Sequence, residues 1–173
     1  MNKKIVVALV ALMACFGLKA NAQNVMHNGA NIITVGAGLT DSHVPLSVAF
    51  DHGVVDNLFE SPNASLSLGG MAGALLGKNY AGFVIGPRVG IHYHFIPQLD
   101  TYFSLMLGLT GARYKENVNV GNGEKVKVDS GWSNEFEWGS HIGARYFFTP
   151  QVGAFIELGY GYTFANIGIA FKL

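Results

Sequence analysis

FVIGPRVGIHYHF, at residues 83–95, is the stretch that decides the fold. Its odd positions, from Phe83 to Phe95, are mostly large and apolar. Its even positions are mostly small, basic or polar, as at Arg88 and His92. Successive side chains of a β-strand point to opposite faces, so an alternation with a period of two predicts a strand. This strand has one greasy face and one face of small or polar residues.

The same alternation recurs along the chain, and residues 136–148 repeat it closely. Phe136 and Trp138 share the greasy face there, whereas His141 and Arg145 share the opposite face. No helical pattern follows residue 22, so an all-β fold is expected. The alternation predicts eight strands, at about residues 30–39, 45–54, 63–76, 81–95, 99–114, 132–148, 152–161 and 164–173.

The composition of the polar face indicates which face meets water. Only 13% of the residues are charged and 23 are glycine, so this face is a poor aqueous surface and a good filling for a narrow lumen. Trp138 and Tyr146 lie eight residues apart on the greasy face. That spacing corresponds to roughly 20 Å of height in a tilted strand, close to the apolar band of a membrane barrel. The alternative is a soluble, lipocalin-like β-fold with the greasy face inside.

Residues 1–22 have the pattern of an export signal. Lys3 and Lys4 precede ten apolar residues, and Ala20-Asn21-Ala22 fits a cleavage site. The expected mature chain, residues 23–173, carries eight basic and eleven acidic residues and no cysteine. This charge balance argues against a nucleic-acid partner. A lipidated Cys15 is the alternative for the leader.

An internal repeat supports construction from hairpins. Residues 86–108 and 139–161 match at eight of 23 positions, including Pro97-Gln98 and Pro150-Gln151. Proline fits a tight turn and not a central strand, so both motifs predict turns, and residues 54–62 predict a third on the same side. Eight strands then place both chain ends with these turns. In membrane barrels the short turns are periplasmic and the longer loops are extracellular.

The last eight residues, NIGIAFKL, carry the most specific motif. Asn166, Gly168, Phe171 and Leu173 resemble the C-terminal β-signal that the barrel-assembly machinery binds. With the leader, the turns and the alternation, the chain resembles the small outer-membrane β-barrel family, the eight-stranded outer-membrane protein A/X-like class.

That resemblance implies an eight-stranded, antiparallel, up-and-down transmembrane β-barrel at residues 23–173. It implies export through the periplasm to the cell outer membrane. The expected partners are outer-membrane lipid and the assembly machinery. No catalytic residue carries over from this class.

The lumen-facing side chains are the candidate functional site. Charges in a narrow lumen must pair, since an unpaired buried charge is very costly. We expect a plug of ion pairs with Arg88, Arg145 and Glu157 at its centre. The alternative is a narrow pore that passes small solutes or ions. The alternation places Asp51, Arg88, His92, His94, Glu135, Glu137, His141, Arg145, Glu157 and Lys172 on this face, and the predicted network comprises Arg88, Arg145, Glu157, Glu135, Glu137, His92 and His141.

Other chemistry finds weaker support in the sequence. His92 and His94 share a strand face and could bind a metal with His141, but a hydrogen-bonded interior pair is favoured. Asp41-Ser42-His43 are adjacent and cannot fold onto one another as a catalytic triad. We therefore expect no metal, no cofactor and no catalysis. The predicted function is that of an outer-membrane protein with a structural or surface-interaction role.

Residues 115–131 predict a hairpin above the membrane. The valine pairs Val118/Val120 and Val126/Val128 are symmetric about Gly123, which indicates a loop of three or five residues. The parity of the two arms disagrees, so a β-bulge is expected near Ser130-Gly131. The segment is either an ordinary exposed loop or an edge that binds a surface protein by strand addition.

Overall fold

The structure is a computed structural model that describes residues 24–40, 44–119 and 125–173. The predicted leader, the Asp41-Ser42-His43 motif and the turn at 121–123 lie outside the described residues. One short 3-10 turn, η1 (Leu58–Glu60), accompanies the strands. Within the described residues, no helix is long and apolar enough to cross a membrane. The strands are β1 (Asn31–Leu39), β2 (Val44–Asp56), β3 (Ala64–Leu76), β4 (Tyr80–Ile96), β5 (Leu99–Asn119), β6 (Lys125–Asp129), β7 (Ser133–Phe147), β8 (Val152–Tyr160) and β9 (Ala165–Lys172).

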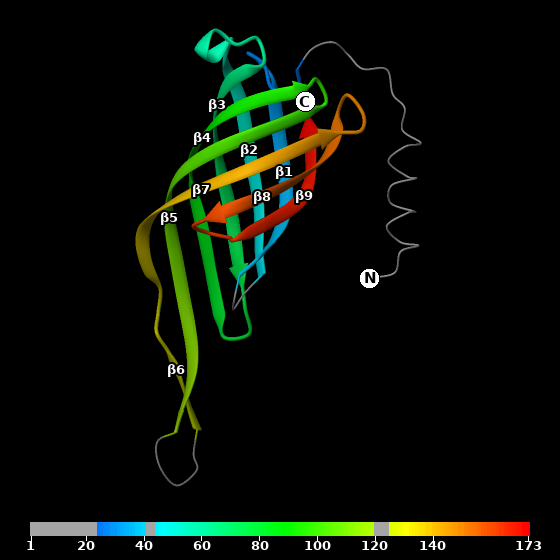
Figure 1. Cartoon of the computed structure of the whole chain (residues 1–173). Helices are drawn as coiled ribbons and strands as arrows, with labels where there is room; N and C mark the ends of the chain where they lie inside the picture. Colours follow the sequence, from blue (N-terminus) through cyan, green and yellow to red (C-terminus); the bar gives the residue numbers. More distant parts are fainter. Residues whose placement is uncertain (1–23, 41–43, 120–124) are drawn as a thin grey trace, which may run out of the picture.

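Eight of these strands close into a barrel (Figure 1). Within these eight, each strand pairs antiparallel with the following one, so that β5 pairs with β7, and β9 returns to pair with β1. The ninth strand, β6, pairs with β5 beyond the barrel. The prediction of an eight-stranded, up-and-down antiparallel barrel is confirmed. The predicted bounds hold to within two residues, except that β5 runs on to Asn119.

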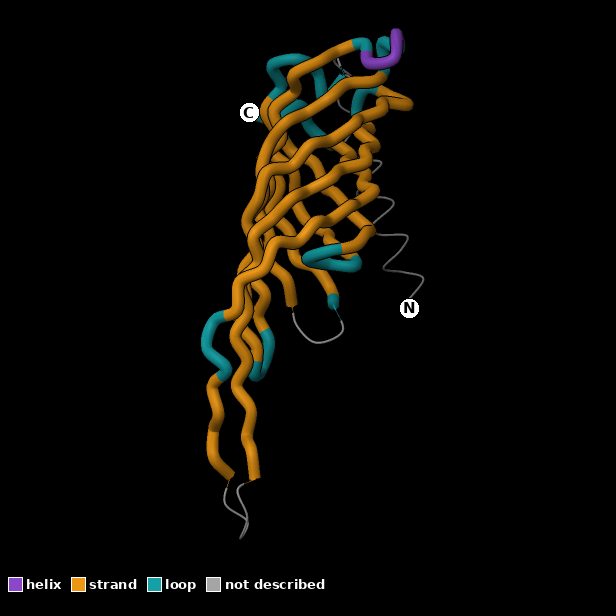
Figure 2. The backbone as a smooth tube through the Cα atoms, turned by 90° about the vertical axis from the view of Figure 1, so that its left-hand side faces the viewer, coloured by secondary structure: helices purple, strands orange, loops and turns teal. Residues whose placement is uncertain are grey.

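The barrel has two different ends. The proline-turn end holds the turns at 57–63, 97–98 and 148–151, together with the C-terminus. The hairpin end holds the turns at 77–79 and 161–164 and the β5–β6 hairpin. Figure 2 shows this hairpin projecting well beyond the barrel wall. At the proline-turn end the Leu173 N–H donates to the Asn31 carbonyl at 2.9 Å, which ties the last residue to β1.

The greasy face points outward, as the sequence predicts. Ile85 and Ile142 are 54% and 69% exposed, whereas Arg88 and Arg145 are 4% and 0% exposed. A water-soluble barrel has the opposite arrangement, with apolar side chains inside and charges outside. The surface of this barrel is therefore made for lipid.

Paired aromatic rings mark both edges of the apolar surface. At the proline-turn end, Tyr93 and Phe95 lie 5.0 Å apart between ring centroids, and Tyr146 and Phe148 lie 5.7 Å apart. At the hairpin end, Trp138 and Tyr160 lie 5.3 Å apart, and Phe83 and Trp132 lie 5.8 Å apart. Aromatic girdles at both membrane interfaces are typical of transmembrane barrels.

Residues 24–30 form an N-terminal plug at the proline-turn end, which the sequence analysis did not anticipate. Val25 and Met26 are buried in a cluster with Ile32 and Phe147. The Met26 N–H donates to His94 Nε2 at 3.1 Å, and the Ser65 hydroxyl donates to the Met26 carbonyl at 3.1 Å. The chain thus covers its own lumen at this end.

The predicted bulge is present where β6 gives way to β7. Lys115 pairs with Asp129 and Ala112 pairs with Ser133, so three steps along β5 face four steps along the other arm. Gly131 takes up the extra residue with a φ of +72°, a conformation that favours glycine. The pair Asn119–Lys125 is centred on residue 122, one residue before the predicted centre at Gly123, and the five residues between them lie outside the described residues.

We predict that lysine is tolerated on the hairpin and not on the barrel wall. Val48 on β2 and Val128 on β6 are 50% and 48% exposed, which makes them a matched pair. Val48→Lys should lower the free energy of unfolding from lipid vesicles by about 2–4 kcal/mol, because the ammonium group enters the hydrocarbon region. Val128→Lys should change it by less than about 0.5 kcal/mol. Equal effects of the two substitutions would contradict a lipid-facing wall.

Candidate functional site

The central ion-pair residues of the lumen come from four strands that lie far apart in the sequence. Asp51 lies on β2, Arg88 on β4, Arg145 on β7 and Glu157 on β8. Each occupies an inward position of its strand, where burial alternates with exposure. Closing the sheet into a barrel brings these positions together, because the inward faces of all eight strands share one narrow interior.

The four side chains form a chain of ion pairs. Arg88 Nη2 lies 2.7 Å from Glu157 Oε1, and Arg88 Nε lies 3.3 Å from Asp51 Oδ1. Arg145 Nη2 donates to Asp51 Oδ2. Asp51 therefore bridges both guanidinium groups, and none of these side chains is more than 3% exposed. In such surroundings a lone charge is strongly destabilising, so the pairs hold one another in place.

Tyr102 on β5 supports both arginines. Its ring centroid lies 4.3 Å from Arg145 Cζ and 5.4 Å from Arg88 Cζ, a geometry for cation–π contacts. Its hydroxyl donates to Glu157 Oε1 at 2.8 Å. Gly143 makes room for the ring, because a Cβ at that position would lie 2.3 Å from Tyr102 Cζ.

A second group of polar side chains lies between this network and the N-terminal plug. His92 Nδ1 lies 2.8 Å from Asp100 Oδ1, and the Ser67 hydroxyl lies 2.8 Å from His92 Nε2. His94 Nε2 lies 3.6 Å from Asp100 Oδ1. Arg145 Nη1 lies 3.7 Å from Asp100 Oδ2, which joins this group to the ion pairs.

Towards the hairpin end, Asn166 and Tyr162 continue the network. The Asn166 amide donates to Ser47 Oγ at 2.9 Å and to the Tyr162 hydroxyl at 3.0 Å. The Tyr162 hydroxyl donates to Glu157 Oε2 at 3.2 Å. His141 lies against the Tyr162 ring, with centroids 4.9 Å apart. Asn166, quoted above for the assembly motif, thus also holds the lumen together.

The other residues of the assembly motif lie on β9 or just after it. Gly168 pairs with Gly36 of β1. A Cβ added to Gly168 would lie 2.0 Å from the Val35 carbonyl oxygen, so only glycine fits at this position. Phe171 and Leu173 are exposed on the outer face. The motif thus occupies the strand that closes the barrel, and its recognition by the assembly machinery stays a prediction.

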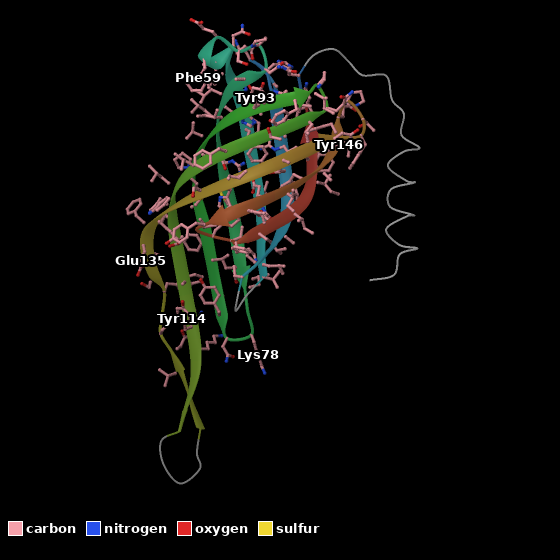
Figure 3. All side chains as sticks on the ribbon, viewed as in Figure 1. Phe59, Lys78, Tyr93, Tyr114, Glu135 and Tyr146 are labelled. Carbon is pink, nitrogen blue, oxygen red and sulfur yellow. The ribbon has the colours of Figure 1, made fainter. Side chains whose placement is uncertain are left out.

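The structure brings most of the predicted lumen residues together and leaves three of them out. Arg88, Arg145 and Glu157 are central, His92 contacts Asp100, and His141 packs on Tyr162. Lys172 instead lies at the proline-turn end, 3.4 Å from His27 Nε2. The placement of Glu135 and Glu137 in the network was wrong. Figure 3 shows Glu135 at the hairpin end, away from the barrel interior.

The reason for this error is the height of the two glutamates along β7. Between Ser133 and Gly139, β7 pairs with β5, and its pairing with β8 begins only at Ser140. Glu135 and Glu137 thus occupy inward positions on a segment that has no neighbouring strand on its β8 side, where the barrel is no longer closed. The period of two in the sequence shows which face of a strand a residue lies on. It does not show at which height along the barrel axis that residue lies.

Sequence reasoning missed Asp100, Tyr102 and Tyr162. Asp100 follows the Pro97-Gln98 turn by two residues, and aspartate is a residue type that is common in turns. The alternation of Asp100, Tyr102, Ser104 and Met106, all buried, is the signal that could have found the first two. Tyr162 lies in a turn between β8 and β9, where no period applies.

The interior has little scope for chemistry. Ser67, His92 and Asp100 form hydrogen bonds in the order of a catalytic triad. Each is at most 1% exposed, however, so a substrate has no path to the serine hydroxyl. Within the described residues, no group of three or more His, Cys, Asp or Glu side chains is arranged to hold a metal ion.

The sequence matches no protein-family model and no curated protein. Among solved structures, the chain is similar to the N-terminal β-barrel domain of Pseudomonas aeruginosa OprF. The TM-score is 0.56 with 16% sequence identity, over 84% of this chain and 98% of that one. A designed transmembrane β-barrel gives a TM-score of 0.50 with 19% identity, over 86% of this chain and 98% of that one. This protein has the transmembrane β-barrel fold.

Within this transmembrane barrel, Glu157 offers a test of the ion-pair network. Glu157→Gln should lower the free energy of unfolding by about 3–5 kcal/mol, because the Arg88 guanidinium loses its 2.7 Å carboxylate partner. Glu135→Gln makes the same chemical change outside the network and should cost less than about 0.5 kcal/mol. Urea unfolding in vesicles measures both values. A neutral Glu157→Gln would show that the ion pair has no structural role.

Proposed function

We propose that this protein is an integral outer-membrane barrel that acts without catalysis, as a structural or surface-interaction protein with a closed lumen. The observation that carries the proposal is the ion-pair network of Asp51, Arg88, Arg145 and Glu157. It joins β2, β4, β7 and β8 across the interior. An eight-stranded barrel is just wide enough for side chains to fill, so such a network leaves no room for an aqueous channel.

Two further layers support a closed lumen. The N-terminal plug covers the proline-turn end, where Met26 is 1% exposed. Near the hairpin end, Met71, Val84 and Met106 form a buried apolar cluster with Ala49 and Tyr162. A permeating ion would have to displace an apolar layer on each side of the charged one. This arrangement disfavours the narrow pore as the alternative function.

The proposed orientation places the hairpin end outside the cell. Short turns face the periplasm and longer loops face outward in this architecture. The longest projection, the β5–β6 segment, lies at the hairpin end, whereas the proline-turn end has turns of two to seven residues and the N-terminal plug. Export of the chain through the periplasm to the outer membrane fits this orientation.

The burial of Ser67, His92 and Asp100 supports a function without catalysis. Nucleophilic catalysis requires a serine hydroxyl that a substrate carbonyl can approach. Ser67 is 0% exposed in the interior of the barrel. Its hydrogen bonds serve to satisfy buried polar atoms, which would otherwise be costly.

Conductance in planar bilayers tests the closed lumen. We expect the purified mature chain to insert and to give no stable current steps, because the plug and the network block the axis. Insertion itself is checked by heat-modifiable migration, in which unboiled and boiled samples run differently. Regular current steps from an inserted barrel would overturn the closed lumen and favour the pore. A chain that fractionates as a soluble protein would overturn the membrane location.

We propose that the surface-interaction role belongs to the β5–β6 hairpin. Within the described residues β6 pairs only with β5, so its outer edge presents backbone groups that another strand can bind. Strand addition uses main-chain hydrogen bonds at such an edge. An exposed cell-surface protein segment of extended conformation is the partner that this edge fits.

Proline substitutions test the hairpin edge. Val118 and Val126 face each other across the β5–β6 pair, and proline at both positions removes backbone donors there. The double variant should lose cell-surface adhesion while retaining heat-modifiable migration, since the barrel wall is unchanged. Adhesion at the wild-type level would count against strand addition by this hairpin.

A further inference from the structure

The outward face of β5 changes character where it leaves the apolar band. Leu105, Leu107 and Leu109 are exposed on this face at alternate positions. The same series continues through Gly111 to Arg113 and Lys115. The change occurs beside the Phe83–Trp132 contact, which belongs to the aromatic girdle. Cationic side chains therefore follow directly above the lipid-facing surface, at the depth of lipid headgroups.

These cations line a pocket, here called the rim pocket. It has a volume of about 190 Å³ and lies between the β3–β4 turn and the base of the hairpin; its lining includes Lys78, Asn79, Arg113, Lys115 and Trp132. The Lys115 N–H donates to the Asn79 carbonyl at 2.9 Å, which fixes the turn against β5. Figure 3 shows Lys78 on this turn, at the hairpin end beside the strand that carries Tyr114.

One carboxylate, Asp129, adjoins the pocket. Arg113 Nε donates to Asp129 Oδ1 at 2.8 Å, and these hydrogen bonds lower the pKa of that carboxyl to about 2. Asp129 is thus ionised at neutral pH and balances Arg113. Lys115 lies directly across the β5–β6 pair from Asp129 and also interacts with its charge, so the three cations of the pocket and this one carboxylate leave a net charge of +2 for a ligand. Glu135 and Glu137 take the inward positions of β7, on the opposite face of the sheet.

We propose that the rim pocket binds a phosphate group of the phosphorylated glycolipid in the outer leaflet. The proposal rests on the outer-membrane orientation given above. Two lysines beside a tryptophan at the membrane interface suit a ligand with an anionic head and an apolar tail. The head lies in the pocket, and the acyl chains lie along the exposed leucines of β5. A soluble phosphate compound shares the head chemistry but not the tail.

Tryptophan fluorescence gives a direct test. The chain has two tryptophans, so Trp138→Phe leaves Trp132 as the single reporter in the pocket. The refolded mature chain in zwitterionic micelles is titrated with bisphosphorylated lipid A, with dephosphorylated lipid A and with inorganic phosphate. Phosphorylated lipid should bind at least about tenfold more tightly than either of the other two. Equal binding of dephosphorylated lipid, or equal binding of inorganic phosphate, would overturn the proposal.

Charge-matched variants separate a pocket from diffuse attraction. Lys78→Gln with Lys115→Gln should weaken binding by at least about tenfold, since each lysine near an anionic lipid surface contributes roughly fivefold. Lys125→Gln with Lys127→Gln removes the same charge from β6 and should change binding by less than about twofold. Equal losses from the two pairs would overturn the pocket. Heat-modifiable migration of every variant shows separately whether the membrane barrel itself has formed.

Discussion

The position of Asp51 between Arg88 and Arg145 is the interaction on which the rest of the interior depends. Two guanidinium groups that share a narrow lumen repel each other unless a carboxylate lies between them. Asp51 supplies that charge from β2, while Glu157 and Asp100 supply further carboxylates on either side. Since these residues come from β2, β4, β5, β7 and β8, satisfying the charges requires every one of those strands to be in register. The network therefore selects the closed barrel over an open or slipped sheet, in addition to filling it.

The arrangement with apolar side chains outside and polar side chains inside meets two requirements, one set by the lipid and one set by the closed interior. Lipid provides no hydrogen-bond partner, so every backbone N–H and C=O group in the wall must be paired within the sheet, and closure of β9 on β1 removes the last edge. The interior in turn has no bulk water, so its polar side chains must satisfy one another. Ser47, Tyr162 and Asn166 do this at one end, and Ser65 and His94 do it at the other, where they hydrogen-bond to Met26 of the N-terminal plug. The N-terminal plug thus supplies hydrogen-bond partners for buried polar side chains and is an integral part of the interior.

The fold could be predicted from the sequence because the period of a strand is a local property. Ile85 and Arg88 lie on opposite faces of one strand, and Ile142 and Arg145 show the same contrast between an apolar and a polar face. This contrast indicates that the apolar face points outward. The candidate site was predictable only in part. Parity placed Glu135 and Glu157 on one face of their strands, yet the depth at which each strand enters the barrel depends on the stagger between neighbours, which no single strand encodes. Asp100 was missed for a related reason. It lies two residues after the Pro97-Gln98 turn and reads in the sequence as part of that turn, and only its contact with His92 shows that it belongs to the lumen. Contacts made by loops, such as those of Tyr162 and the N-terminal plug, have no period at all.

A rigid, filled barrel confines variable function to its ends. The proline-turn end is short and covered by residues 24–30, so we propose that contacts with other molecules are made at the hairpin end. There β5 runs continuously from the wall into the hairpin, and its outward face passes from leucines to Arg113 and Lys115 without a break in the strand. The bulge at Gly131 lets the opposite arm follow with the other parity, which keeps Asp129 beside Arg113. Continuity of β5 means that the lipid-facing leucines and the cations of the rim pocket lie on one uninterrupted strand. In our proposal, a ligand held at the rim pocket would therefore orient the hairpin relative to the bilayer.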